Sequence, residues 1–171
     1  FIIYNIPQLA SVALSMSLFK EMRKNPRVIG VKNSSMPVQD IQMFKDEAGE
    51  DSVVFNGPDE QFVGGRAIGA DGGIGGTYAV MPELFLKMDE LIRAGKMQEA
   101  CKVQYAADEI IYAMCACKGN LYAVMKKILE LREGLLCGSV HLPMPGLVAE
   151  DMPQVKKCAA MIDAAIEKYT K

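Results

Sequence analysis

The stretch Val28-Ile29-Gly30-Val31-Lys32, which reads VIGVK over residues 28–32, decides the fold because a charged amine ends an apolar run. β-Branched runs of this kind are typical of strands that are buried on both faces, as in the interior of a parallel sheet. The polar residues Asn33, Ser34 and Ser35 follow directly, so we expect the strand to end near Lys32. A buried strand that presents a lysine at its carboxyl end indicates a functional site there.

Three other stretches repeat this pattern before residue 81. They are FIIYNIP (1–7), SVVFNG (52–57) and GGIGGTYA (72–79), and amphipathic helical segments at 14–24, 38–49 and 60–69 separate the four expected strands. The expected strand ends, residues 4, 32, 57 and 76, lie 28, 25 and 19 residues apart. This spacing approximates the βα repeat of a parallel sheet, in which every crossover carries a helix.

The number of βα units predicts half of a closed barrel. A complete (β/α)8 barrel needs about 250 residues, and an open four-stranded sheet would expose both of its edges. The chain also begins with Phe1 inside a strand-like run. We therefore predict an α/β fold: the C-terminal half of a TIM barrel (strands 5–8) in residues 1–81, then the last barrel helix and a helical extension in 82–171. The two form one continuous unit that lacks an N-terminal half.

Composition excludes several classes of function. The net charge of −2 gives no footprint for nucleic acid or an anionic membrane, and no apolar run approaches the roughly 20 residues of a membrane span. His141 is the only histidine, so a catalytic triad or a multi-histidine metal site is not expected. The five cysteines contain no CxxC pair, and we expect buried free thiols in a reducing compartment such as the cytoplasm.

Functional residues of parallel α/β folds gather at the carboxyl ends of the strands. Lys32 stands at one such end, where partial desolvation favours the neutral amine that can attack a carbonyl; a buried ion pair or a solvent-reaching lysine are the alternatives. Tyr4 stands at the equivalent height on the first strand. Its hydroxyl could shuttle a proton near an imine, or simply pack and hydrogen-bond.

Two further strand ends carry candidate binding residues. Asp59 and Glu60 follow the third strand and could recognise hydroxyl groups, although acidic residues that start a helix also interact with its dipole. The stretch from Gly69 to Gly76 has five glycines in eight residues, which lets a backbone approach a ligand or a neighbouring strand. It lacks the GK[ST] of a P-loop, and an anion site built on backbone N–H groups remains an alternative.

Together these segments resemble one family. The motifs YNIP (4–7), GVKNSS (30–35), FNGPDE (55–60) and GADGGIGGTYAVMPE (69–83) occur in the order and at the spacing of the pyruvate-dependent class I aldolases of the N-acetylneuraminate lyase and dihydrodipicolinate synthase superfamily. The resemblance covers the whole chain and corresponds to the family's C-terminal part, from strand 5 onward.

The resemblance implies the role of each site residue. Lys32 matches the lysine that forms an imine with pyruvate or with the sugar acid, and Tyr4 matches the tyrosine that relays protons during carbon–carbon cleavage. The family needs no metal or organic cofactor, acts on small molecules, here sialic acid and pyruvate, and forms homo-oligomers, which we expect to be tetramers. Its carboxylate-binding residues lie on the second strand, outside these 171 residues.

Details of the motifs favour the lyase branch, which cleaves N-acetylneuraminate to N-acetylmannosamine and pyruvate. Residues 8–11 lack the arginine usual in the synthases. Ser34 matches a hydroxyl residue of the lyases, and Gly57, Asp59 and Glu60 match residues that bind the polyol tail. Two positions depart from the lyases: Gly76 replaces a serine and Pro58 a tyrosine. One alternative is a sister pyruvate aldolase, either for another 2-keto-3-deoxy sugar acid or similar to dihydrodipicolinate synthase. The other is a non-catalytic half-barrel or assembly piece.

Overall fold

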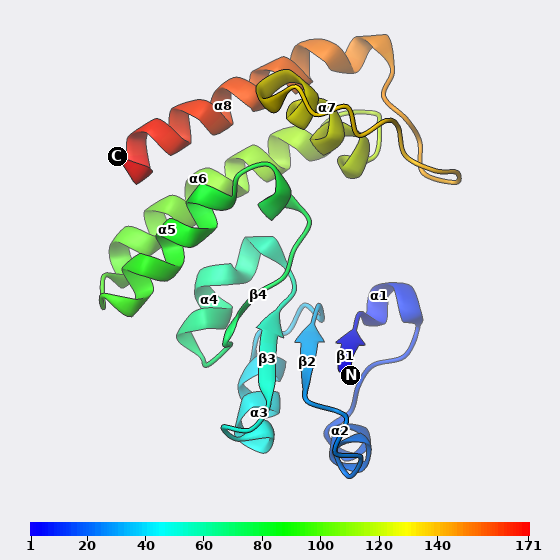
Figure 1. The fold of residues 1–171 in the computed structure, drawn as a ribbon, viewed down its shortest axis with the longest axis vertical. Coiled ribbons are helices and arrows are strands. Elements are labelled where there is room, and N and C mark those ends of the chain that lie inside the picture. The colour runs from blue at the N-terminus through cyan, green and yellow to red at the C-terminus, as the bar shows by residue number, and fades with distance from the viewer. The chain divides into compact units, whose positions relative to one another are not determined.

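A computed structural model describes all 171 residues, which form two compact units, residues 1–75 and 76–171. Figure 1 traces the chain through both. The first unit holds the strands and the helices between them, and the second is helical. None of the helices combines the length and the apolar composition that a membrane span requires.

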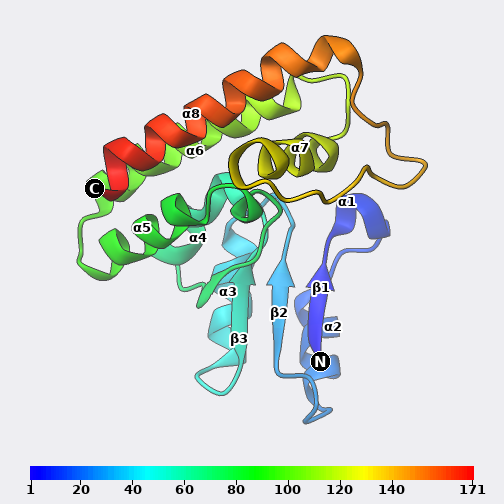
Figure 2. The same cartoon turned by 45° about the horizontal axis from the view of Figure 1, so that its top comes forward.

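The first unit is built on a four-stranded parallel sheet. Its strands are β1 (Ile2–Asn5), β2 (Gly30–Asn33), β3 (Val53–Asn56) and β4 (Gly72–Gly73), paired in chain order β1-β2-β3-β4 (Figure 2). The helices of this unit are α1 (Pro7–Ala10), α2 (Met16–Arg23), α3 (Gln39–Ala48) and α4 (Phe62–Ala67), with a 3-10 turn η1 (Asp59–Gln61) before α4. Sequential parallel strands joined by helices confirm the predicted α/β half-barrel.

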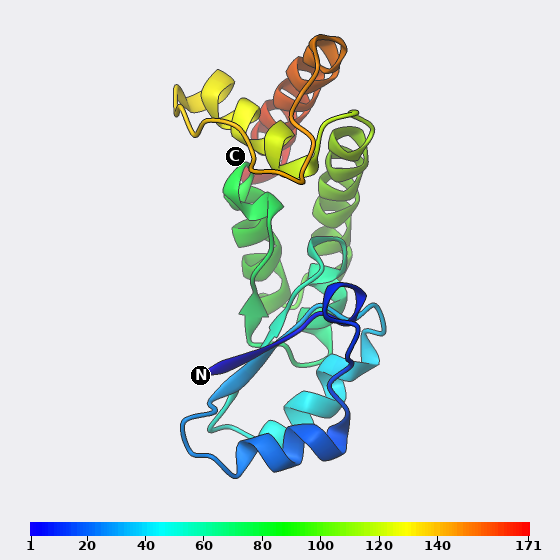
Figure 3. The ribbon, with the colours of Figure 1, turned by 90° about the vertical axis from the view of Figure 1, so that its right-hand side faces the viewer.

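One face of the sheet carries the core of this unit. Phe19 of α2 meets Phe44 of α3 edge to face, with ring centroids 5.0 Å apart, and both pack with Val31 and Val54 of the sheet. Figure 3 shows α2 and α3 on this face of the strands. Burial of these apolar side chains supplies the main driving force for the unit.

The start of β2 is more open than VIGVK predicted. Ile29 lies before β2 rather than inside it and is half exposed. On the sheet face opposite the core, Tyr4 of β1 is 53% exposed. The prediction that the apolar run is buried on both faces is therefore wrong for Ile29. The strand begins at Gly30 because the backbone ladder with Val53 of β3 starts there.

The glycine-rich fourth strand is shorter than predicted. Only Gly72 and Gly73 pair with β3, and residues 77–79 form a 3-10 turn, η2 (Thr77–Ala79), instead of a strand. Glycine weakens a strand because it offers no side chain to pack and loses much backbone entropy on ordering.

The second unit is a bundle of four helices. They are α5 (Pro82–Arg93), α6 (Met97–Cys115), α7 (Leu121–Glu133) and α8 (Met152–Thr170), with a 3-10 turn η3 (Ala149–Asp151) before α8. Val155, Cys158 and Ile162 follow helical spacing along one face of α8, and all three are buried. All five cysteines are free thiols, but Cys115 and Cys137 are exposed, so the prediction of buried thiols is wrong for these two.

Candidate functional site

Tyr4 and Lys32 lie side by side at the carboxyl end of the sheet. The register of β1 and β2 pairs the two residues directly, and both side chains project from the face opposite the α2–α3 core because neighbours on a strand alternate. Nζ of Lys32 lies 4.2 Å from the centroid of the Tyr4 ring, a cation–π contact. Within this chain Lys32 forms no ion pair.

Ser34 and Gly57 are adjacent just beyond the ends of β2 and β3. The N–H of Gly57 donates to the carbonyl of Asn33 at 2.7 Å. A Cβ at position 57 would lie 2.0 Å from Oγ of Ser34, so any larger residue there would displace the serine. The structure therefore brings together two residues that the sequence placed in separate motifs.

Asp59 and Glu60 both lie in the first turn of η1, but their surroundings differ. Asp59 is 7% exposed, whereas Glu60 is open to solvent. A Cβ at Gly75 would lie only 1.5 Å from Oδ1 of Asp59, so the carboxylate rests against the backbone of the glycine-rich segment. The sequence predicted the same binding role for Asp59 and Glu60. The close approach of Gly75 to Asp59 could not be predicted from the residues around them.

Gly76 belongs to the second unit, and its neighbourhood is different from that of the other candidates. Its φ of −71° and ψ of −47° suit any residue, so the backbone does not require glycine here. A Cβ would lie 3.3 Å from Cε1 of Tyr122 and 3.7 Å from its Oη. The Tyr122 ring at the start of α7 thus limits the space beside Gly76, a feature that the motifs did not predict because 46 residues separate the two.

The glycine-rich segment is anchored by Asp71. Its carboxylate accepts a hydrogen bond from Nζ of Lys45 at 2.8 Å and another from the N–H of Val54 at 2.8 Å. Burial alone would raise the pKa of Asp71, but these bonds outweigh it and hold the pKa below its ordinary value. Asp71 is therefore an ionised anchor between α3 and the first half of β3.

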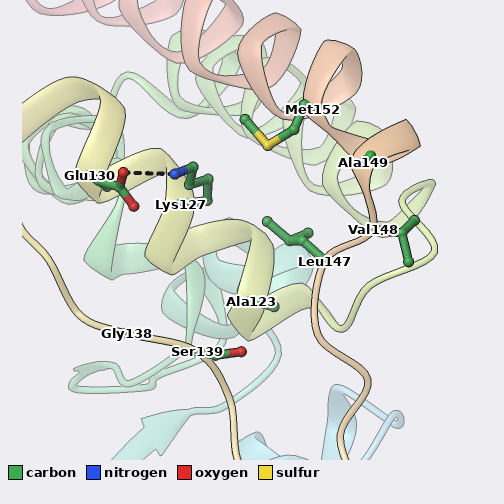
Figure 4. Close-up of a pocket in the computed structure, with 9 residues that line it drawn as sticks. All are labelled: Ala123, Lys127, Glu130, Gly138, Ser139, Leu147, Val148, Ala149 and Met152. Carbon is green, nitrogen blue, oxygen red and sulfur yellow. Dashed lines mark hydrogen bonds and ion pairs between the residues drawn. The ribbon is translucent and has the colours of Figure 1, made fainter.

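A separate pocket of about 370 Å³ lies wholly in the second unit (Figure 4). It lies between α7 and the segment that leads into α8, and an ion pair of 2.7 Å between Lys127 and Glu130 lines it together with Leu147 and Met152. None of the residues predicted from the sequence lines this pocket. The chain also gathers no group of three or more His, Cys, Asp or Glu side chains that could hold a metal ion.

Comparison with known proteins identifies relatives along nearly the whole chain. Residues 1–162 match the model of the dihydrodipicolinate synthetase family. The N-acetylneuraminate lyase of Mediterraneibacter gnavus is 66% identical over 169 residues, which is 99% of this chain and 54% of that protein. The chain thus spans about half the length of the relatives that it matches.

Solved structures agree with this similarity. The catalytic lysine mutant of the Ruminococcus gnavus sialic acid aldolase superposes with a TM-score of 0.97 at 65% identity, covering 99% of this chain and 55% of that one. The N-acetylneuraminate lyase from Fusobacterium nucleatum complexed with pyruvate has a TM-score of 0.78 at 30% identity, covering 99% and 54%.

Proposed function

The chain belongs to the dihydrodipicolinate synthetase family, and from this premise we propose that it is the part of an N-acetylneuraminate lyase that carries the imine-forming lysine. The reaction is the reversible cleavage of N-acetylneuraminate to N-acetylmannosamine and pyruvate. The observation that carries the proposal is the pairing of Lys32 with Tyr4, 4.2 Å from Nζ to ring centroid, at the carboxyl end of a parallel sheet.

The chemistry assigns a distinct role to each of the two side chains. The neutral amine of Lys32 attacks the C2 carbonyl of the sugar acid, and loss of water leaves a protonated imine. The Tyr4 hydroxyl relays the proton of the C4 hydroxyl, because it takes up that proton as it gives its own to the substrate carboxylate. The electron pair of the C3–C4 bond then moves into the imine, N-acetylmannosamine leaves, and an enamine remains. Protonation at C3 and hydrolysis release pyruvate and restore the amine.

The cation–π contact suits this cycle. The lysine ammonium and the protonated imine carry the same charge, so the face of the Tyr4 ring stabilises both. The contact therefore holds Nζ near the Tyr4 hydroxyl before and after the covalent bond forms. A merely packed tyrosine would not need to keep its ring against the amine.

The remaining candidates would bind substrate. Ser34 and Gly57 would bind beside the imine, and Asp59, Glu60 and Gly76 would bind the polyol tail. The groups that hold the substrate carboxylate would come from the other half of the barrel, which we propose pairs with the edges of this sheet. We also propose a homotetramer in the cytoplasm, in keeping with the free thiols of the chain.

Two relatives support this assignment. One is described as a catalytic lysine mutant of a sialic acid aldolase, and it is 65% identical to this chain. Another is an N-acetylneuraminate lyase complexed with pyruvate. A lysine nucleophile and pyruvate as substrate are the two elements that the imine mechanism requires.

Replacement of Lys32 tests the proposal. In a protein that carries this chain together with the other half of the barrel, Lys32→Ala and Lys32→Arg should abolish both turnover and borohydride-dependent labelling by pyruvate. Arginine keeps the charge but stays protonated and cannot attack a carbonyl. Lys102→Arg on α6 is the matched control and should label normally. Persistent labelling in either Lys32 variant would assign the imine to another lysine.

The departures at Pro58 and Gly76 favour one second candidate, a sister aldolase for a shorter 2-keto-3-deoxy acid. It would label with pyruvate in the same way and differ only in substrate preference. A non-catalytic half-barrel or assembly piece would not label at all. Trapping with pyruvate therefore separates enzyme from non-enzyme, and substrate preference separates the two aldolases.

A further inference from the structure

Three asparagines form one layer across the sheet, directly beyond the layer of Tyr4 and Lys32. The register pairs Asn5 with Asn33 and Asn33 with Asn56. All three are buried, with Asn33 and Asn56 fully so. They project toward the helices, because neighbours on a strand alternate between faces. Amides are costly to bury in such a place unless they are hydrogen-bonded.

A continuous chain of hydrogen bonds satisfies two of these amides. Nδ2 of Asn5 donates to Oδ1 of Asn33 at 2.6 Å, and Nδ2 of Asn33 donates to Oγ of Ser35 at 2.8 Å. The hydroxyl of Ser35 donates to Oδ2 of Asp40 at 2.6 Å. At the other end, Oδ1 of Asn5 accepts from the N–H of Leu14 at 3.0 Å. The chain therefore runs from the loop before α2, across β1 and β2, to a carboxylate in the first turn of α3.

Asp40 fixes the direction of every bond in this chain. The Ser35 hydroxyl has one proton to donate, and Oγ lies 2.6 Å from Oδ2 of Asp40 and 3.1 Å from Oδ1 of Asn33. A carboxylate only accepts, so the shorter bond to Asp40 takes the proton and Ser35 accepts from Nδ2 of Asn33. Asn33 in turn presents its oxygen to Asn5. If the amide of Asn33 were turned over, its Nδ2 would face Nδ2 of Asn5, and two donors would oppose each other there. Only the observed orientation of the Asn33 amide pairs a donor with an acceptor at Asn5.

We propose that the chain Asn5–Asn33–Ser35–Asp40 positions Tyr4 against Lys32. Asn5 and Asn33 are the direct sequence neighbours of Tyr4 and Lys32, at the end of the sheet where the ladder between β1 and β2 stops. Apolar side chains would hold the sheet together at such a buried position without the cost of burying amides. The directed bonds instead fix the register and the spacing of β1 and β2 at their carboxyl ends. This geometry sets the distance from the Tyr4 hydroxyl to the imine.

The inference rests on the proposed aldolase function, because its readout is the cleavage reaction. Two quantities are compared in the complete barrel: the kcat for N-acetylneuraminate cleavage, and the amount of pyruvate trapped by borohydride when trapping is run to completion. Loss of Lys32 chemistry lowers both. Misplacement of Tyr4 lowers kcat and leaves the amount of trapped pyruvate unchanged. A loss of folded protein would lower both.

The decisive variants reverse the direction of the hydrogen bonds that join residues 33, 35 and 40. In Asn33→Asp, Ser35 lies between two carboxylates, those of residue 33 and Asp40. Its single proton can be donated to only one of them, so one bond is lost and two like charges come close together. We expect kcat to fall by about tenfold or more with trapping retained. In the double variant Asn33→Asp/Asp40→Asn, residue 40 can donate to Ser35 and Ser35 can donate to residue 33. The bonds are then all satisfied in the opposite direction, and kcat should return to within about threefold of the unmodified protein.

A second pair of variants covers the case in which Asn33→Asp does not fold. Ser35→Ala removes the middle link and should lower kcat with trapping retained, whereas Ser35→Thr keeps the hydroxyl and should keep kcat. Asn120→Ala removes a helix cap in the second unit, where Oδ1 of Asn120 accepts from the N–H of Tyr122. It is the control for general destabilisation and should leave the ratio of cleavage to trapping unchanged.

Three results would overturn the inference: an unchanged ratio in Asn33→Asp and Ser35→Ala, no recovery in the double variant, or an equal fall in Asn120→Ala. An unmodified protein that traps no pyruvate would instead overturn the proposed function, and the positioning role with it.

Discussion

At the scale of the residue, Tyr4 and Lys32 face each other because each stands at the same height on neighbouring parallel strands. Replacement of Tyr4 by Phe keeps the ring over Nζ and removes only the hydroxyl. The imine should still form, so borohydride trapping with pyruvate should persist while cleavage falls by roughly 10²–10⁴-fold. Steady-state cleavage and trapping, measured on the same preparation, check this.

Tyr105 on α6 is exposed and supplies the control for this prediction. Tyr105→Phe removes the same atom from a tyrosine outside the candidate site, so cleavage should be unchanged. An unchanged rate in Tyr4→Phe as well would mean that another group relays the proton.

The residue scale also shows what the sequence could and could not predict about the site. The pairing of Tyr4 with Lys32 follows from counting along two strands, because both lie just before the strand ends. The different burial of Asp59 and Glu60 does not, since it depends on the approach of Gly75 to Asp59. Adjacent residues of the same charge give no local indication of which one turns inward.

At the scale of the element, the start of α8 depends on one buried carboxylate. Asp151 accepts hydrogen bonds from the N–H groups of Lys118 at 2.8 Å, Gly119 at 3.0 Å and Val148 at 3.1 Å. Burial would raise the pKa of Asp151, but these three bonds together hold the pKa below its ordinary value. One side chain thus ties the turn after α6 to the segment that enters α8.

Asp151→Asn should change how the free energy of unfolding depends on pH. A lowered carboxyl pKa contributes stability that is full above the ordinary value of about 3.9 and is lost as the pH falls through the native pKa. We therefore expect Asp151→Asn to lower the free energy of unfolding at neutral pH, by an amount that shrinks as the pH falls below about 4. Urea titrations followed by circular dichroism at several pH values measure this difference.

Glu150 is exposed and immediately precedes Asp151, so Glu150→Gln serves as the control. Its effect on the free energy of unfolding should be small at every pH. A constant difference between Asp151→Asn and the unmodified protein down to pH 3 would show that ionisation of Asp151 is not what holds the segment.

Elements with strong periodicity were predictable, and those that depend on contacts were not. The stripe of Val155, Cys158 and Ile162 follows helical spacing, so its burial could be predicted from the sequence alone. The fourth strand could not, because glycines leave no pattern of side chains to distinguish a strand from a loop. Its two paired residues are set by β3, to which they hydrogen-bond.

At the scale of the whole molecule, substrate preference tests the proposed N-acetylneuraminate lyase against the sister aldolase. A site that hydrogen-bonds a polyol tail binds a substrate that carries the tail more tightly in the transition state than one that lacks it. Asp59 is buried, Glu60 next to it is open to solvent, and we propose that both bind the tail. We therefore expect a higher kcat/KM for N-acetylneuraminate than for a six-carbon 2-keto-3-deoxy acid, both measured on the complete barrel.

Gly76 adds a graded test of the same point. A serine there would supply one neutral hydrogen bond, on the order of 0.5–1.5 kcal/mol, and Gly76→Ser should lower the KM for N-acetylneuraminate slightly without altering pyruvate trapping. Its Cβ would lie 3.3 Å from Cε1 of Tyr122, so the ring must shift by a few tenths of an ångström. Gly76→Ala requires the same shift of the Tyr122 ring but supplies no hydroxyl, so it is the matched control and should not lower KM.

The comparison of substrates decides between the two aldolases. If the six-carbon acid is preferred by about tenfold or more, a difference of about 1.4 kcal/mol in transition-state binding, Asp59 and Glu60 do not form a polyol site. The sister aldolase then replaces the N-acetylneuraminate lyase as the function of this chain.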